Sequence, residues 1–305
     1  MDVPRLAAEG SGIRSGDDLV LAVDIGGTKM AVGLVDWAGH LRWSSSAPTP
    51  QGADAETLWS HLVALLGSVP DGPPPLACGV GCGGPMEGGD AVSPLNIPGW
   101  RGFPLHSRLA GLTGVDTWVE NDAKALALGE GWCGAAHDRR NYLSMVVSTG
   151  VGAGIVLDGR LLDGALGNAG HIGHVVVEPE GHRCVCGGQG CLEAEASGLS
   201  IARDIGAPPE TAGLEVRRRV GILVGRAVAS VANLLDLRLA TVAGSVALGY
   251  GEPFFAAAQE EIDRRARLVF SRGCRIVAGG LGSEGPLVGA GALAWRGLGR
   301  SIGVG

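Results

Sequence analysis

Residues 19–36 read LVLAVDIGGTKMAVGLVD. The apolar runs on either side of Gly26-Gly27 predict two buried strands, and the glycine pair predicts the tight turn of a hairpin. Residues 142–157, YLSMVVSTGVGAGIVL, repeat the order of strand, glycine-rich turn and strand, with the turn predicted over residues 149–154. Two hairpins of the same kind predict a duplicated α/β architecture with a ligand between its halves.

Other elements follow from hydrophobic periodicity. Leucines at positions 58, 62, 65 and 66 recur at helical spacing and predict a helix over 55–66. Apolar residues recur in the same way over 216–235 and predict a long amphipathic helix. A further helix is predicted from Asn121 or Asp122, both preferred N-cap residues, to about Trp132. Short strands are predicted over 41–46 and 76–81 and at runs ending in Glu120, Ala243 and Ala278.

The composition limits the possible classes of protein. With 305 residues, 46% of them hydrophobic, the chain can bury a core in one large or two medium domains. It lacks an apolar run long enough to span a bilayer and an apolar signal core in its first 18 residues, so we expect a soluble, cytoplasmic protein without a membrane partner. A net charge of −7 argues against nucleic-acid binding, which needs a surplus of Lys and Arg.

The two glycine turns carry groups that suit phosphate. In residues 24–29, DIGGTK, a carboxylate at a strand end can face a bound metal ion, while the glycines let backbone N–H groups approach phosphate oxygens. The alternative is an ordinary hairpin turn. The second turn is neither a Walker A loop nor a Rossmann fingerprint, because it lacks the Gly-Lys-Ser/Thr ending and is followed by a strand.

Asp122 closes the segment VEND at residues 119–122, where polar residues end an apolar strand. A carboxylate at this position can act as a general base that accepts the proton of a substrate hydroxyl as it attacks a γ-phosphate. The alternative is that Asp122 only caps the helix that follows.

Seven cysteines, an odd number, favour a reducing compartment over a disulfide framework. His174, Cys184, Cys186 and Cys191 have the spacing His-x9-Cys-x-Cys-x4-Cys and predict a closed, structural Zn²⁺ site. His171 and His182 are alternative nitrogen ligands. The remaining cysteines are expected to be buried small hydrophobes: Cys78, Cys82, Cys133 and Cys274.

These motifs together resemble the ROK family (repressors, open reading frames and kinases). The resemblance extends from Leu19 to about Trp295 and rests on residues 24–29, 121–122 and 148–154, and above all on the zinc segment that ends in Cys191-Leu192-Glu193. It implies a two-domain actin/hexokinase-like (ribonuclease H-like) α/β fold that closes on sugar and ATP, often in a homodimer. It also implies transfer of the γ-phosphate to the 6-hydroxyl of a hexose or N-acylhexosamine.

The resemblance also assigns roles to single residues. Asp122 is implied as the catalytic base, and the sugar-binding residues are Asn96, Asn121, His171, His174 and Glu193. ATP with Mg²⁺ is implied at Asp24, Gly26, Gly27, Thr28, Lys29, Thr149, Gly150, Gly152 and Gly244. The main departure is His171, because the common pattern of the family has a glutamate there. A histidine is typical of the branch that phosphorylates N-acetylmannosamine.

The expected domain organisation follows from the two halves. We predict a flexible tail over 1–17, an N-terminal domain over 18–118 completed by a C-terminal helix near 287–305, and a larger domain over 119–286 with the zinc loop 174–191. One alternative is a sugar-responsive ROK regulator, which would need a winged helix-turn-helix before the first strand, where only about 18 residues stand here. Another is a catalytically inactive sugar-binding protein.

Overall fold

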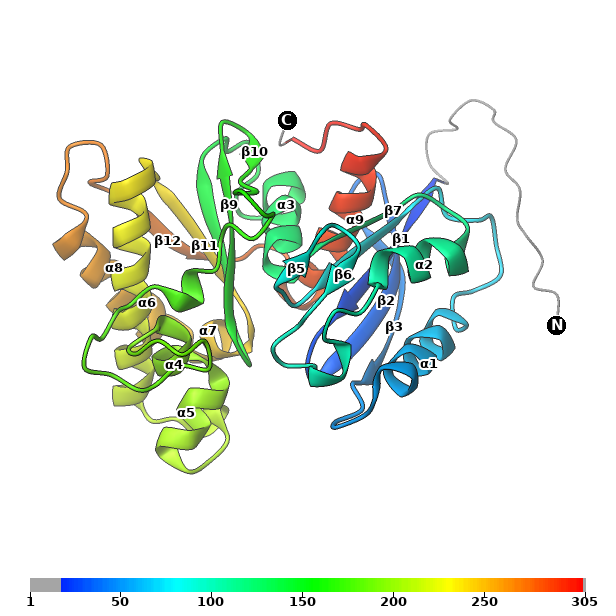
Figure 1. The fold of residues 1–305 in the computed structure, drawn as a ribbon. Coiled ribbons are helices and arrows are strands. Elements are labelled where there is room, and N and C mark those ends of the chain that lie inside the picture. Colours follow the sequence, from blue (N-terminus) through cyan, green and yellow to red (C-terminus); the bar gives the residue numbers. More distant parts are fainter. Residues whose placement is uncertain (1–17, 304–305) are drawn as a thin grey trace. The chain divides into compact units, whose positions relative to one another are not determined.

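The computed structural model describes residues 18–303, which form two compact units (Figure 1). Unit 1 contains the described residues up to 132 together with 163–168 and 284–302, and unit 2 contains 133–162 and 169–283. The predicted tail over 1–17 lies outside the described residues. The predicted domain borders at 118/119 and 286/287 remain predictions.

Unit 1 contains a five-stranded sheet in the order β3-β2-β1-β4-β7. The two glycine-linked strands and their neighbour are antiparallel, whereas β4 and β7 run parallel to β1. The strands are β1 (Leu19–Ile25), β2 (Lys29–Asp36), β3 (Leu41–Pro48), β4 (Cys78–Cys82) and β7 (Thr117–Asn121), and a separate ribbon joins β5 (Met86–Glu87) and β6 (Ala91–Val92).

Helices cover both faces of this sheet, because alternate residues of the buried strands point to opposite sides. Leu21, Val23 and Ile25 of β1 share a core with α1 (Ala55–Leu66) and α2 (Leu105–Thr113). α9 (Gly285–Gly297) packs on the central strands, where a Cβ at Gly79 would lie 1.9 Å from the Ala290 carbonyl oxygen. Gly79 therefore lets the helix backbone lie directly on β4.

Unit 2 contains a sheet of the same design, in the order β10-β9-β8-β11-β12. Its three first strands are again antiparallel and its last two again run parallel to the central strand. The strands are β8 (Tyr142–Val147), β9 (Val151–Leu157), β10 (Arg160–Leu161), β11 (Leu239–Ala243) and β12 (Arg275–Ala278). The two mixed sheets confirm the predicted two-domain, duplicated α/β architecture.

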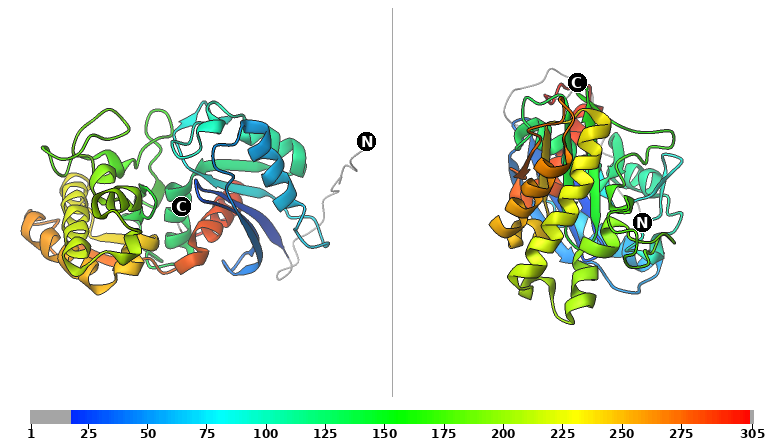
Figure 2. Two further views of the ribbon diagram at one scale, coloured as in Figure 1. Left: turned by 90° about the horizontal axis from the view of Figure 1, so that it is seen from below. Right: turned by 90° about the vertical axis from the view of Figure 1, so that its left-hand side faces the viewer.

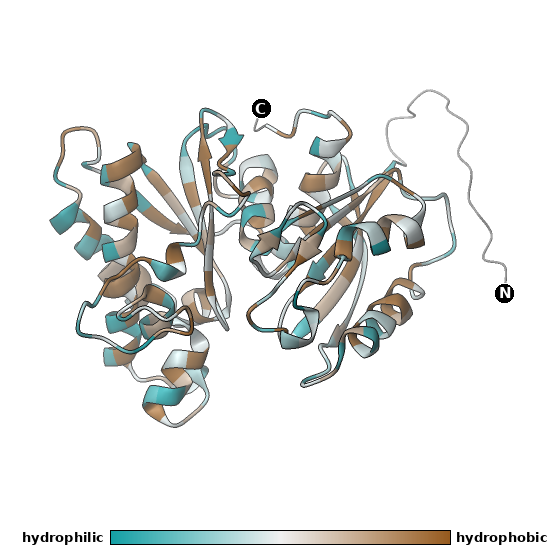
Figure 3. Ribbon diagram, in the orientation of Figure 1, coloured by the Kyte–Doolittle hydropathy of each residue, from teal (hydrophilic) through white to brown (hydrophobic). Residues whose placement is uncertain are grey.

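The core of unit 2 joins this sheet to its helices, of which α6 (Leu214–Leu235) and α8 (Glu252–Arg265) lie side by side (Figure 2). Figure 3 shows hydrophobic residues along the strands of both sheets. Unit 2 also contains α4 (Leu192–Ala196), α5 (Gly198–Ile205) and α7 (Ser245–Tyr250), with the short 3-10 turns η2 (Ile172–His174) and η3 (Pro209–Thr211). In unit 1 lie η1 (Pro98–Trp100) and all but the last residue of α3 (Asp122–Cys133), and η4 (Gly282–Glu284) lies where the chain passes from unit 2 to unit 1. Within residues 18–303, we find no helix that combines the length and the apolar character needed to cross a membrane.

Two expectations were wrong. The turn between β8 and β9 is shorter than predicted, because Gly152 and Gly154 already belong to β9 and pair with Val146 and Ser144. Cys133 is exposed, since it is the last residue of α3, whereas the expected burial is confirmed for Cys78, Cys82 and Cys274.

Candidate functional site

The carboxyl ends of β1, β4 and β7 bring the predicted polar residues of unit 1 to one edge of the sheet. In the parallel register Asp24 lies beside Gly81 and Gly81 beside Glu120, so only a glycine stands between Asp24 and the segment that leads to Asp122. A Cβ at Gly81 would lie 3.4 Å from the Asp122 Cα. Carboxyl ends of parallel strands are the usual place for ligands in α/β sheets.

Hydrogen bonds from two side chains hold the β1–β2 turn in place, while the tip of the turn is exposed. Thr49 donates its hydroxyl to the Gly26 carbonyl (2.7 Å), and Gln51 Nε2 donates to the Gly27 carbonyl (2.8 Å). Thr28 and Lys29 are exposed. A Cβ at Gly27 would lie 2.7 Å from the Asn96 Cβ, so the loop with Asn96 packs directly on this turn.

Asp24 has an unusual electrostatic setting. Burial raises its pKa from 3.8 to about 7, and the nearby charge of Asp122 adds to the rise, while Lys29 opposes it. A bound cation would favour the ionised carboxylate. Because Mg²⁺ takes carboxylate oxygens as ligands, the chemistry of Asp24 fits its expected magnesium-binding role.

The raised pKa predicts a pH-dependent stability. Between pH 4 and 7 the folded protein keeps a proton on Asp24 that the unfolded chain has lost, so the free energy of unfolding falls as the pH rises through this window. We expect Asp24→Asn to remove this cost and to raise stability at pH 8 by about 1 to 4 kcal/mol, at about 1.4 kcal/mol per pKa unit, with little effect near pH 4. Thermal unfolding of both proteins across this range tests it, and a stability difference that does not change with pH would contradict it.

Asn121 and Asp122 both accept backbone N–H groups at the start of helix α3. Asn121 Oδ1 accepts the N–H groups of Ala123 (3.1 Å) and Lys124 (3.3 Å), which satisfies donors of the first turn. Asp122 Oδ1 accepts the Ala123 N–H at 2.8 Å. Asn121 therefore shares the capping role that was the alternative to a catalytic role for Asp122.

Lys124 lies two residues after Asp122, is 1% exposed, and was not predicted as a site residue from the sequence. Its ammonium group pairs with Glu120 (2.9 Å) and Asp163 (3.1 Å) and donates to the Gly167 carbonyl (2.9 Å). Asn168 bonds to the backbone of Met86 from the same segment. Residues 163–168 are thereby fixed on unit 1, three residues before His171. A lone lysine among alanines and leucines was the available signal.

In unit 2 the second glycine turn is bound to the segment that follows Cys191. Glu193 Oε2 accepts the Val151 N–H at 2.9 Å, and the Ser148 carbonyl accepts the Gly198 N–H at 2.7 Å. Thr149 and Gly150 form the partly exposed tip of this turn, and Gly152 lies in β9.

Gly244 is next to the same turn. Its φ of +98° and the 2.4 Å that would separate a Cβ from the Val147 carbonyl oxygen both require glycine. The following Ser245 hydroxyl lies 3.0 Å from that of Ser148. The predicted phosphate turn and Gly244, which the resemblance implies as a further ATP contact, are therefore neighbours in unit 2.

The four predicted metal ligands come together in unit 2. Their ligand atoms all lie within 4.8 Å of one another. Cys186 Sγ and Cys191 Sγ are 3.7 Å apart, and Cys184 Sγ is 3.6 Å from His174 Nδ1. A tetrahedral Zn²⁺ with Zn–S bonds of about 2.3 Å would place its ligands about 3.6 to 3.8 Å apart. The donor set and its size thus fit zinc, and His182 is bonded to Glu195 instead.

His174 directs Nδ1 toward the thiols, which leaves Nε2 for other partners. When a metal occupies Nδ1, the remaining ring nitrogen carries the proton and becomes a donor. The His171 ring lies 6.0 Å from that of His174, and both side chains are partly exposed.

Comparison with known proteins agrees with this arrangement of motifs. The ROK family model matches residues 20–296. This chain belongs to the ROK family. The ROK chain is 30% identical to a glucokinase of Thermotoga maritima, over 90% of its own length and 96% of that protein. It is 36% identical to an N-acetylmannosamine kinase of Citrobacter koseri, over 76% of its own length and 84% of that protein.

The fold of this ROK protein also matches solved structures. The crystal structure of a ROK family glucokinase from Streptomyces griseus in complex with glucose and AMPPNP superposes with a TM-score of 0.80 at 29% identity, covering 91% of this chain and 99% of that one. The two-domain α/β fold is thus shared with this ROK family glucokinase.

Proposed function

We propose that this ROK family sugar kinase transfers the γ-phosphate of ATP to the 6-hydroxyl of a hexose or an N-acylhexosamine. The observation that carries the proposal is the meeting of Asp24 and Asp122 at one sheet edge, with Asn96 packed on the adjoining glycine turn. Relatives named for both glucose and N-acetylmannosamine support the two substrate classes.

Asp122 has the role of general base. Its carboxylate accepts the proton of the 6-hydroxyl as that oxygen attacks the γ-phosphorus and the bond to the β-phosphate oxygen breaks. Asn121 accepts the N–H groups of Ala123 and Lys124, so the first turn of α3 does not depend on Asp122 alone. Asn121 and Asn96 are the proposed partners of sugar hydroxyls in unit 1.

ATP is proposed to bind at the two glycine turns. Asp24 would hold the Mg²⁺ ion, which neutralises phosphate charge when bound, and the N–H groups near Gly26, Gly27, Thr28 and Lys29 would contact phosphate. In unit 2 the corresponding groups are at Thr149, Gly150 and Gly152, with Gly244 beside them for the nucleoside. The ATP analogue bound to the Streptomyces griseus glucokinase supports ATP as the donor.

The zinc loop is proposed to help bind the sugar and to take no direct part in phosphate transfer. Zinc held by His174, Cys184, Cys186 and Cys191 would leave no open coordination position. It would fix the His174 ring so that Nε2 donates to a sugar hydroxyl, beside Glu193 as a hydroxyl acceptor. A homodimer, which the resemblance implies, stays a prediction.

A coupled assay of ADP formation with glucose, mannose, N-acetylglucosamine and N-acetylmannosamine tests the proposal. We expect turnover with at least one of them and a sugar 6-phosphate as the product. A chain that binds these sugars but forms no ADP would instead be a sugar-binding protein.

His171 should determine which sugar is preferred. Glutamate accepts hydrogen bonds from two hydroxyls, whereas neutral imidazole accepts one and donates one, so the two side chains cannot satisfy the same hydroxyls. We expect N-acetylmannosamine or another 2-substituted hexose to be used at least as well as glucose. His171→Glu should shift the ratio of kcat/KM values toward glucose by about 5- to 150-fold, since an unpaired buried hydroxyl costs about 1 to 3 kcal/mol.

The alternative role of His171 is to orient His174 or a neighbouring loop. In that case His171→Glu would lower kcat/KM for every sugar by one common factor. An unchanged ratio between sugars would therefore contradict the specificity role.

A further inference from the structure

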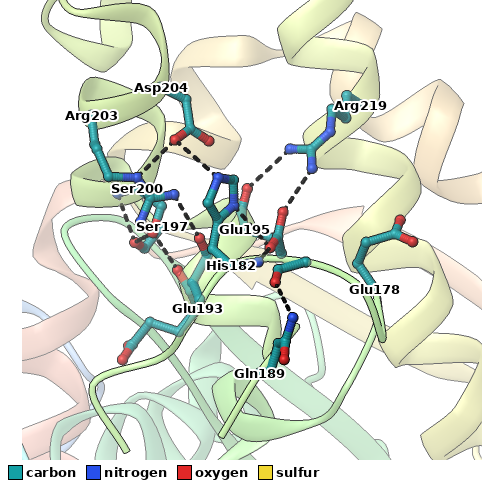
Figure 4. Close-up of polar contacts among 12 residues, drawn as sticks. Glu178, His182, Gln189, Glu193, Glu195, Ser197, Ser200, Arg203, Asp204 and Arg219 are labelled. Atoms are coloured by element: carbon teal, nitrogen blue, oxygen red, sulfur yellow. Dashed lines mark hydrogen bonds and ion pairs between the residues drawn. The ribbon is translucent and has the colours of Figure 1, made fainter. Parts of the chain in front are cut away.

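Glu195 is a buried carboxylate in unit 2 for which the proposed reaction has no use. It lies on α4, two residues after Glu193, and is 1% exposed. Its Oε1 accepts the backbone N–H of His182 (2.6 Å) and lies 3.0 Å from His182 Nδ1, and its Oε2 accepts a hydrogen bond from Arg219 of α6 (2.7 Å). Figure 4 shows these contacts converging on Glu195, while the Glu193 carboxylate points away from them.

The contact falls in the middle of the zinc loop, two residues before Cys184. A Cβ at Gly181 would lie 2.3 Å from Glu195 Oε1, so the loop backbone packs directly on the carboxylate. The His182 carbonyl accepts the Gly190 N–H (2.8 Å), which closes the turn that carries Cys184 and Cys186. Glu195 thus holds the part of the loop from which two thiols project.

The same helix is joined to the start of the loop. The Leu192 N–H donates to the Val175 carbonyl (2.9 Å), next to His174. A Cβ at Gly173 would lie 3.3 Å from the Glu193 Cβ. Both ends and the middle of the loop are therefore fastened to α4.

Fastening the loop reduces the cost of binding a metal. Ordering a free backbone costs conformational entropy at every residue, and nine residues separate His174 from Cys184. A loop already ordered by hydrogen bonds to a charged group has lost this entropy before the metal arrives, and such bonds are among the strongest in proteins. An unfastened loop would lose it on binding.

We propose that Glu195 is a positioning residue that preassembles the zinc loop on α4, so that zinc affinity and the placing of His174 beside Glu193 depend on it. The proposal rests on the zinc site proposed above. In this proposal Glu195 couples the metal centre to Glu193, the carboxylate that is proposed to bind the sugar.

The test compares zinc release from the wild type and from Glu195→Gln, using a chromogenic zinc chelator. Glutamine keeps the size of the side chain but removes the charge and points an amide group at Arg219 or at His182. We expect the zinc affinity to fall about 10- to 100-fold, as for other residues that orient metal ligands.

Glu178→Gln is the charge-matched control. Glu178 lies in the same loop and pairs with Arg226 of α6 (3.0 Å), but its carboxylate is 42% exposed and is bonded to Arg226 rather than to His182. We expect its zinc affinity to stay within about twofold of the wild type, since exposed ion pairs contribute little. Equal weakening in both variants would show a general charge effect and overturn the proposal.

Sugar kinetics give a second readout. In Glu195→Gln, KM for the sugar should rise at limiting zinc and return toward the wild-type value when zinc chloride is added in excess. A raised KM at full zinc content would place the effect of Glu195 elsewhere and overturn the proposal. Zinc release from Glu195→Gln at the wild-type rate would also overturn the proposal.

The zinc content of the wild type and the folding of the variant are judged separately. Wild-type protein that contains no zinc after chelator-free purification would refute the zinc site and this proposal with it, while leaving kinase activity to be judged by its own assay. If Glu195→Gln does not fold, Arg219→Lys keeps the charge but loses the planar fork. It should then release zinc faster than the wild type, and an unchanged rate would overturn the proposal.

Discussion

Asp122→Asn is expected to lower kcat by about 10²- to 10⁴-fold, the usual contribution of a general base. The amide keeps the shape of the side chain and its hydrogen bond to the Ala123 N–H, but it cannot take the proton of the sugar hydroxyl. Sugar binding, measured by calorimetry, should remain largely intact because the proposed role of Asp122 is confined to the transfer step.

The thermal stability of the same variant separates catalysis from helix capping. Asn121 already accepts the N–H groups of the first turn, so the midpoint of unfolding should change little or rise, since one of two neighbouring acidic groups is lost. Turnover near the wild-type level would reduce Asp122 to a residue of the helix end.

Loss of zinc should have the second large effect. We expect one Zn²⁺ per chain in protein purified without chelator, and its absence in Cys184→Ser and Cys191→Ser. Structural zinc contributes on the order of 10 kcal/mol to the folding of small zinc domains. Even a fraction of that in unit 2 should lower Tm by at least about 5 °C, at about 2 to 4 °C per kcal/mol, and activity should fall with it.

Cys133→Ser is the matched control for these variants. Cys133 is exposed and lies outside the cluster of four ligands, so its replacement should leave the zinc content and Tm close to those of the wild type. Wild-type protein without zinc by metal analysis, or an unchanged Tm after chelation, would contradict the structural role of the metal.

Local patterns predicted much of the fold. The helix over 55–66 has the expected bounds, and both glycine-linked hairpins form, because hydrophobic periodicity, apolar runs and turn glycines are properties of short segments. The length of the second turn was wrong for a local reason, since Gly152 and Gly154 pair in β9 although glycine also suits a turn. The spacing of His174 and the three cysteines likewise predicted a cluster that the structure brings together.

Contacts between distant segments were not predicted. Lys124 is buried because residues 163–168 supply partners, among them the carbonyl of Gly167, which is 43 positions away. Glu195 is buried because Arg219 and the zinc loop meet on it. In both cases the partners that stabilise the buried charge come from distant segments, which the local sequence does not reveal.

The place of α9 has a consequence for how the chain is made. This helix packs on the central strands of unit 1, and its Trp295 indole donates to the Asp36 carbonyl, 259 positions earlier. All residues of β1, β4 and β7 leave the ribosome before it, so one face of their sheet stays uncovered until synthesis passes residue 297. The strands and helices of unit 2, by contrast, are complete at that point. During translation, unit 2 can therefore complete its core first, although most of it is synthesised second. Unit 1 is mostly synthesised first, and one face of its sheet stays exposed until α9 has been made.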